Sequence, residues 1–356
     1  MRTKLVGLFI GLSCAMQAQI VYHDAEQFPL LGRGTDAVKV SYQRLPDSLE
    51  NISRKEIWDL GKNSAGMAIR FRSNSTSIKA KWEVLNQFRM GHMTNIGVRG
   101  VDLYAIDEGK WYFVGSGFPN GKESEATLIK NMTPREREFM LYLPLYDGAL
   151  KVAIGVDSLA TISAPLVNEP VRERPLVFYG TSILQGGCAN RPGMAHTSIL
   201  SRWLKRECIN LGFSGNARLD YEIASLIASV EDASVIVLDF LPNVTIDQLK
   251  ERFLPFYKII RKECPNTPIL LIENPPFPNG RFNTEISEQY TRKNEMLNDY
   301  YKQLKKSGDK HVYYFSNEGM IGYDGEATVD GAHFTDLGFM RYAEKLYPVL
   351  KKLMNK

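Results

Sequence analysis

Hydrophobic and polar positions follow two different patterns along the chain, and the change lies near residues 165–175. From about residue 38 to residue 165, apolar and polar residues alternate in short runs separated by turn residues. Residues 77–84, for example, alternate apolar side chains with lysine and glutamate. This period of two is typical of strands that cover a core with one face only. We therefore expect an antiparallel, jelly-roll-like β-sandwich of roughly 130 residues.

Two pairs of runs in this region predict β-hairpins. Residues 101–106 and 110–114 flank Asp-Glu-Gly at 107–109. Residues 139–143 and 150–154 are joined through Tyr-Asp-Gly at 146–148. Short connections that contain glycine are typical of hairpins.

After residue 175, short apolar runs alternate with longer amphipathic segments. The apolar runs predict strands at 176–179, 209–213, 235–240, 269–273 and 312–315. The amphipathic segments predict helices at 195–206, 221–230, 247–262, 285–306 and 335–352. Strands that alternate with helices form a parallel sheet with helices on both faces. We expect a flavodoxin-like, three-layer α/β fold around a five-stranded parallel sheet.

Composition narrows the class of protein. A hydrophobic share of 44% excludes disorder as the main state. The 44 Lys and Arg residues nearly balance the 40 Asp and Glu residues, which leaves a net charge of +4 over 356 residues. A nucleic-acid interface needs clustered basic residues, so we expect no nucleic-acid partner. The composition does not indicate which oligomeric state the protein adopts.

The first eighteen residues have the layout of a secretory signal peptide. Arg2 and Lys4 precede an apolar run at 5–16, and a small residue stands at Ala18. The run is shorter than the roughly 20 residues that span a bilayer, and no later segment is long and apolar enough, so we expect no stable membrane span.

We therefore expect export to the periplasm or the medium, and three parts: a signal peptide at 1–18, a β-sandwich domain at 19–168 and an α/β domain at 169–356. Lipoprotein anchoring at Cys14 is the less favoured alternative, because Gly11 stands where a large aliphatic residue is usual. Beyond the signal, Cys188, Cys208 and Cys264 allow one disulfide at most, and whether any two pair is left open. Their spacing matches no zinc pattern, so we expect no metal site.

Residues that could take part in catalysis follow the predicted strands. The loops after parallel strands build the functional sites of such folds. Ser182 comes directly after the strand at 176–179, Gly215 follows the strand at 209–213, and Asn243 follows the strand at 235–240. Each of these residues, taken alone, is also compatible with a structural turn or a helix cap.

The turn before the last helix carries a sharper signal. Asp330 precedes His333 by three residues, so its carboxylate can accept a hydrogen bond from one ring nitrogen of the histidine. The other ring nitrogen is then left as a base, as in serine–histidine–carboxylate catalysis.

These blocks occur together in the order found in the SGNH (GDSL-type) hydrolases, and the chain resembles that family over about its C-terminal half. The residues that carry the resemblance are Gly180-Thr181-Ser182, Gly215, Asn243, Asp330 and His333. The string GGCANRPG at 186–193 and the string GVDLY at 100–104 resemble a two-domain branch with an N-terminal G-x-D-L-Y β-sandwich.

The resemblance implies a serine esterase that needs no metal or organic cofactor. Ser182 would attack the ester carbonyl, His333 would take the proton, and Asp330 would orient the imidazole. The main-chain N–H groups of Ser182 and Gly215 and the side-chain amide of Asn243 would form the oxyanion hole. Two positions depart from the usual pattern of the family. Thr181 stands where an Asp usually precedes the nucleophile. Of the family's sequence motif around Asn243, only the asparagine itself is present.

The substrate expectation rests on the resemblance as well. Exported relatives with an added β-sandwich resemble deacetylases of complex carbohydrates, so we expect a small-molecule or oligosaccharide ester substrate, and O-acetyl esters in particular. Arg191 and Asn274 are candidate substrate-binding residues. Residues 87–94, 274–280 and 320–328 are further candidates for the wall of the cleft.

Two alternatives remain open at the level of sequence. An acyltransferase would pass the Ser182-linked acyl group to an alcohol instead of water. A non-catalytic carbohydrate-binding protein would keep the hydrolase fold without turnover, but the complete Ser, Gly, Asn, Asp and His set argues against it.

Overall fold

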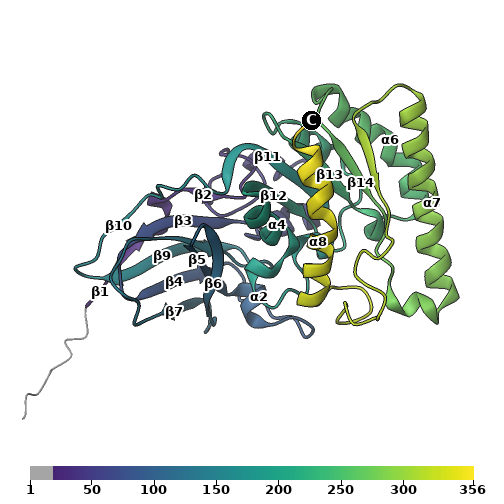
Figure 1. Cartoon of the computed structure of the whole chain (residues 1–356). Helices are drawn as coiled ribbons and strands as arrows, with labels where there is room; N and C mark the ends of the chain where they lie inside the picture. The colour runs from purple at the N-terminus through teal and green to yellow at the C-terminus, as the bar shows by residue number, and fades with distance from the viewer. Residues whose placement is uncertain (1–18) are drawn as a thin grey trace, which may run out of the picture.

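The computed structural model describes residues 19–356 (Figure 1). The expected signal peptide, residues 1–18, lies outside the described residues. Within residues 19–356, no helix combines the length and the hydropathy that a membrane crossing requires. The three cysteines of this part of the chain are buried and unpaired, which answers the question of a disulfide among them.

Two antiparallel sheets form the β-rich N-terminal part. One has the strand order β1-β9-β4-β7, and the other has the order β10-β3-β8-β5-β6 with β2 also paired to β3. The strands of the first sheet are β1 (Ile20–Asp24), β4 (Ile78–Val84), β7 (Glu123–Ile129) and β9 (Ala149–Asp157). Those of the second are β2 (Leu30–Leu31), β3 (Ala68–Ser73), β5 (Val101–Asp107), β6 (Lys110–Gly117), β8 (Arg137–Tyr142) and β10 (Ile162–Ser163). Apolar side chains of both sheets, such as Phe71 and Ile154, meet in one buried cluster.

One predicted hairpin is confirmed and the other is wrong. Strands β5 and β6 pair antiparallel, as expected. Strand β8 instead pairs with β3 and β5, while β9 pairs with β1 and β4 in the opposite sheet. The connection at 143–148 is therefore a corner between the sheets, and all its residues are buried. Period-two alternation is the same for a hairpin and for such a corner, since the inward face is apolar in both.

The second half of the chain forms the predicted parallel sheet. Its order is β12-β11-β13-β14-β15, and every neighbouring pair is parallel. The strands are β11 (Val171–Gly180), β12 (Arg206–Gly212), β13 (Val235–Asp239), β14 (Ile269–Ile272) and β15 (Val312–Phe315). The division at residue 168 stays a prediction.

Five long helices cover the two faces of this sheet, as the alternating pattern predicted (Figure 1). Val177 and Tyr179 of β11 pack on the side of α5, α6 and α7, and Leu176 and Phe178 pack on the side of α4 and α8. The helices are α4 (His196–Leu204), α5 (Tyr221–Ala228), α6 (Ile246–Glu263), α7 (Thr284–Lys306) and α8 (Asp336–Leu353). Short helices that the sequence pattern did not indicate are α1 (Lys55–Gly61), α2 (Asn95–Arg99), α3 (Ser182–Gln185), η1 (Ala25–Gln27), η2 (Asp47–Leu49), η3 (Pro192–Met194), η4 (Leu241–Asn243) and η5 (Pro278–Arg281).

The sandwich packs against the α/β part through the GVDLY string at 100–104. The Asp102 side chain is fully buried, accepts a hydrogen bond from the Gly193 N–H at 2.9 Å, and pairs with Arg191 Nη1 at 2.6 Å. Tyr104 accepts a further bond of 2.6 Å from the same guanidinium. Thr94 donates to the carbonyl of Asn190. These contacts attach the loop at 186–194, which follows α3, to the sandwich.

Candidate active site

The three residues predicted for nucleophilic chemistry lie in one hydrogen-bonded row. Ser182 begins α3 directly after β11, and its Oγ lies 2.8 Å from Nε2 of His333. Nδ1 of His333 lies 2.7 Å from Oδ2 of Asp330. When Nδ1–H donates to the carboxylate, Nε2 is left to accept the serine proton. This is the arrangement that makes a serine hydroxyl nucleophilic.

The turn that carries Asp330 and His333 is closed by its own main chain. The Val329 N–H donates to the His333 carbonyl, and the His333 N–H donates to Asp330 Oδ1, both at 2.8 Å. Burial works to raise the pKa of Asp330, but hydrogen bonds from the N–H groups of His333 and Ala332 and from the imidazole outweigh it and hold the pKa at about 2. Asp330 is therefore a carboxylate at neutral pH and can stabilise an imidazolium.

Gly215 and Asn243 follow the two strands that flank β11 in the sheet, as predicted. Gly215 has a φ of +69°, and no atom would lie within 4 Å of a β-carbon there, so its turn opens onto free space. Within residues 19–356, no hydrogen bond uses its N–H group. Asn243 Oδ1 accepts the Ala217 N–H at 3.2 Å, which leaves the Nδ2 group available as a donor. Ser182 lies in the first turn of a helix, where N–H groups have no helical acceptor.

The sandwich also contributes to the site. The His92 ring lies 5.4 Å from the His333 ring, centroid to centroid, so the segment 87–94 does reach the catalytic side chains. The Tyr146 hydroxyl donates to the Ser182 carbonyl at 3.1 Å. Sequence patterns suggested the segment of His92 but not the residue, and they gave no signal for Tyr146, which lies in the corner between the sheets.

One group of side chains could hold a metal ion among the described residues. A ligand atom from each of His92, Cys188 and His333 lies within 4.8 Å of the others. Burial, reinforced by the charge of Asp330, raises the pKa of Cys188 to about 12, so the thiol is protonated at neutral pH. An ion here would occupy His333 and compete with its role as a base.

The two residues proposed for substrate binding have structural partners. Both side-chain hydrogen bonds of Arg191 go to the sandwich, to Asp102 and Tyr104, and its guanidinium lies 3.8 Å from the centre of the Phe113 ring. Substrate contact by Arg191 stays a prediction. Asn274 is 1% exposed, and its carbonyl accepts a hydrogen bond from Asn317, so it supports the loops after β14 and β15 and offers a ligand almost no surface.

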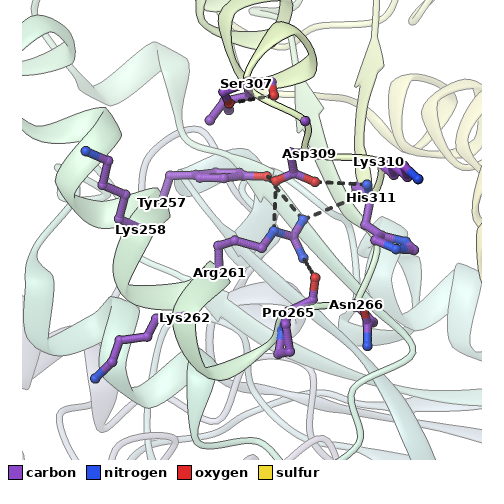
Figure 2. Close-up of a pocket in the computed structure, with 12 residues that line it drawn as sticks. Tyr257, Lys258, Arg261, Lys262, Pro265, Asn266, Ser307, Asp309, Lys310 and His311 are labelled. Carbon is purple, nitrogen blue, oxygen red and sulfur yellow. Dashed lines mark hydrogen bonds and ion pairs between the residues drawn. The ribbon is translucent and has the colours of Figure 1, made fainter.

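A separate hollow of about 540 Å³ lies at the opposite edge of the sheet, where β14 and β15 begin (Figure 2). Figure 2 shows Arg261 at its centre, pointing to Asp309. The guanidinium donates to Asp309, to the Tyr257 hydroxyl and to several carbonyls, including those of Thr267 and His311. These bonds use its donors within the protein, so the cluster joins α6 to the chain before β15 and presents no free charge at its centre.

Comparison with known proteins agrees with this geometry. Residues 173–351 match the model of the GDSL-like lipase/acylhydrolase family, and residues 20–162 match the G-x-D-L-Y model for the N-terminus of SGNH-hydrolase-type esterases. No curated protein matches the chain.

Solved structures match over both parts of the chain. A protein described as a GDSL-like lipase, from Bacteroides ovatus ATCC 8483, is 36% identical with a TM-score of 0.90, over 95% of this chain and 98% of that one. The salicylyl-acyltransferase SsfX3 of a tetracycline biosynthetic pathway is 17% identical with a TM-score of 0.72, over 93% and 96%. A family two carbohydrate esterase from Cellvibrio japonicus is 12% identical with a TM-score of 0.60, over 95% and 99%. The last two likenesses concern the fold alone, whereas the family models and the first structure place this chain in the GDSL-like lipase/acylhydrolase family, with the G-x-D-L-Y N-terminal domain of SGNH-type esterases.

Proposed function

We propose that the protein is a serine esterase that removes short acyl groups, O-acetyl in particular, from carbohydrates. The observation that carries the proposal is the row Ser182–His333–Asp330, with hydrogen-bond distances of 2.8 and 2.7 Å, at the carboxyl edge of the parallel sheet. Ser182 follows the buried strand β11, and main-chain hydrogen bonds close the turn of Asp330 and His333, so the geometry exists before substrate binds. Preorganised groups of this kind lower the barrier to acyl transfer.

The residues fit a two-step reaction. His333 Nε2 takes the proton of Ser182 as Oγ attacks the ester carbonyl, and the negative charge develops on the carbonyl oxygen. The N–H groups of Ser182 and Gly215 and the Asn243 amide would donate to that oxygen, and losing one such donor costs about 2.7–4 kcal/mol of transition-state stabilisation. His333 then protonates the leaving alcohol. Water, deprotonated by His333, releases the acid from Ser182.

A carbohydrate substrate is supported by the fold and by the nearly balanced charge of the chain. Carbohydrate esterases share this two-part fold over nearly the whole chain. The net charge of +4 over 356 residues is small and does not favour a polyanionic substrate. A neutral acylated sugar is compatible with it. We also propose export, on the basis of residues 1–18.

An acyltransferase is the second candidate, because the likeness to SsfX3 spans 93% of the chain. The acyl-serine intermediate would be the same, and only the acceptor would differ. Added alcohol would then divert the acyl group from water to a new ester, and chromatography of the products measures that partition.

A panel of O-acetylated oligosaccharides of xylose, glucose and mannose tests the proposal directly. Mass spectrometry should detect loss of acetyl groups with the wild-type protein and none with Ser182→Ala. Hydrolysis of a simple acetyl ester without any loss of acetyl from the panel would contradict the carbohydrate part of the proposal. Acetyl release that persists in Ser182→Ala would contradict the mechanism.

A further inference from the structure

A second pocket lies beside the turn that carries Asp330 and His333. Its volume is about 680 Å³, within the range of roughly 300–1,000 Å³ typical of small-molecule sites. The loops after β14 and β15 line it, with residues 276–282 on one side and residues 317–327 on the other. Both loops leave the carboxyl edge of the sheet, the edge from which Ser182 projects.

The pocket adjoins the catalytic turn. Ala327 lines it, and the Ala327 carbonyl accepts the Thr335 N–H at the base of the turn. A β-carbon at Gly331 would lie 3.2 Å from Asn279 Nδ2, so the loop after β14 touches the turn itself. Strands β14 and β15 lie two and three places from β11, and neighbouring strands are about 4.8 Å apart. The starts of these two loops are therefore offset from the end of β11 by about 10–15 Å across the sheet.

Two aromatic side chains at this pocket are largely exposed to solvent. Phe282 is 87% exposed and Tyr323 is 80% exposed, although both side chains line the same hollow. Phe277 and Tyr290 also line the pocket and pack edge to face, with ring centres 6.3 Å apart. Single exposed apolar residues are common on protein surfaces, but two large rings that face one concavity are typical of a binding site.

Polar groups without partners surround these rings. Arg281 and Glu318 line the pocket, and within the described part of the chain no side-chain hydrogen bond or ion pair involves either residue. The Arg281 guanidinium lies 6.0 Å from the centre of the Phe282 ring. The loop that carries Tyr323 is nevertheless held in place, because Arg341 donates to both carboxylate oxygens of Asp324 at 2.8 and 2.7 Å. A firm loop, exposed rings, and guanidinium and carboxylate groups without hydrogen bonds suit a ligand that has an apolar face and a rim of hydroxyls.

We propose that this pocket is a subsite for a sugar ring of the substrate that does not carry the scissile acyl group. A pyranose ring has a face of C–H groups that can stack on Phe282 and Tyr323, and hydroxyls that can bond to Arg281 and Glu318. An acetyl group bonded to Ser182 is too small to span this offset of about 10–15 Å, so the pocket serves the alcohol portion of a longer oligosaccharide. This inference rests on the proposed carbohydrate substrate.

Steady-state kinetics of the full chain test the subsite with two kinds of probe. Phe282→Ala and Tyr323→Ala should each lower kcat/KM about three- to tenfold on acetylated hexasaccharides of xylose, glucose or mannose, through a higher KM, because an aromatic contact adds about 0.5–1.5 kcal/mol. The same variants should leave kcat/KM for p-nitrophenyl acetate unchanged. Phe282→Tyr and Tyr323→Phe keep a ring at each position and should retain the wild-type KM on the oligosaccharides.

The outcomes separate this inference from the function on which it rests. If no acetylated oligosaccharide is hydrolysed by the wild-type protein, both the carbohydrate substrate and the subsite are overturned. If the wild type hydrolyses the oligosaccharides and both alanine variants match it, only the subsite is overturned. An equal loss on p-nitrophenyl acetate would assign Phe282 and Tyr323 to the support of the catalytic turn instead.

Discussion

The hydroxyl of Tyr146 donates a hydrogen bond of 3.1 Å to the main-chain carbonyl of Ser182. Tyr146 belongs to the buried corner between the two sandwich sheets, and Ser182 begins the helix after the first strand of the parallel sheet. The sandwich thus supports the main chain of the proposed nucleophile as well as covering the site. Burial raises the pKa of Tyr146, so the hydroxyl keeps its proton and remains a donor.

Tyr146→Phe should therefore lower kcat by about tenfold, because a small displacement of Ser182 weakens its alignment with His333. The free energy of unfolding should fall by only about 0.5–1.5 kcal/mol, since the Ser182 carbonyl still accepts the N–H groups of Gly186 and Gly187. Tyr142→Phe is the matched control, because the Tyr142 hydroxyl is also buried and donates to a carbonyl, that of Ser198. An equal fall of kcat in the two variants would contradict the positioning role.

Asp102 should be a major contributor to the attachment of the two parts of the chain. Asp102→Ala removes one partner of a buried ion pair with Arg191 and should lower the free energy of unfolding by about 3–5 kcal/mol. Asp107→Ala on the same strand breaks an exposed pair with Arg135 and should cost less than about 1 kcal/mol. Urea unfolding measures both, and equal losses would show that the buried pair has no special weight.

Two buried groups on the α4 and α8 side of the sheet, His196 and Asp239, should change the free energy of unfolding with pH in opposite directions. Burial lowers the pKa of His196 to about 3, so its contribution to stability is complete above about pH 6.5 and is lost as the pH falls toward 3. Burial also raises the pKa of Asp239 to about 7, against the effect of a hydrogen bond from Tyr342. Its contribution to stability is present at low pH and is lost as the pH rises from about 4 to 7.

Between about pH 4 and 6.5 the two effects should cancel in the wild-type protein, each amounting to about 1.4 kcal/mol per pH unit. His196→Phe should expose the Asp239 effect, and the free energy of unfolding should then fall as the pH rises. Asp239→Asn should expose the His196 effect, with the opposite slope. Chemical unfolding at a series of pH values measures the slopes, and slopes of the same sign in the two variants would rule out this pairing.

Zinc ions should inhibit ester hydrolysis, because His92 and Cys188 bring donor atoms within 4.8 Å of the ligand atom of His333. Zn²⁺ bound there would remove the base from the reaction, and a chelator should restore the rate. His92→Ala should raise the zinc concentration for half-inhibition about tenfold or more, which corresponds to about 1.4 kcal/mol. Cys208→Ala, which removes a buried thiol elsewhere, should not change it. Equal zinc sensitivity in the wild type and in His92→Ala would exclude this cluster.

The sequence predicted the parallel sheet well, because buried strands have an unbroken apolar pattern and their helices have a clear period. The run at 312–315 matches β15 residue for residue, and the ends of the long helices α6, α7 and α8 lie within one residue of their predicted ranges. The candidate residues of the row were predictable as well. Ser182 directly follows the strand at 176–179, whereas Asp330 and His333 were predicted from their three-residue spacing ahead of the last helix and from the resemblance to the SGNH hydrolases.

The contributions of the sandwich to the site were not predictable in the same way. Tyr146 and Ser182 are 36 residues apart, and the contact exists only because the 143–148 corner turns toward the α/β part instead of forming a hairpin. Arg191 was a candidate substrate-binding residue because it follows the nucleophile loop and could reach the cleft. Its partner, Asp102, lies 89 residues away, so no local pattern identified the ion pair.

The rate of p-nitrophenyl acetate hydrolysis by Ser182→Ala, compared with the wild-type rate, tests the central claim most directly. Loss of the nucleophile of a triad lowers kcat by a factor on the order of 10⁴–10⁶, so hydrolysis by the variant should fall close to the uncatalysed background. Because Ser182 is buried at the start of α3, its substitution could disturb the fold. Circular dichroism therefore checks that the variant is folded. A folded Ser182→Ala protein that hydrolyses the ester at the wild-type rate would contradict the account.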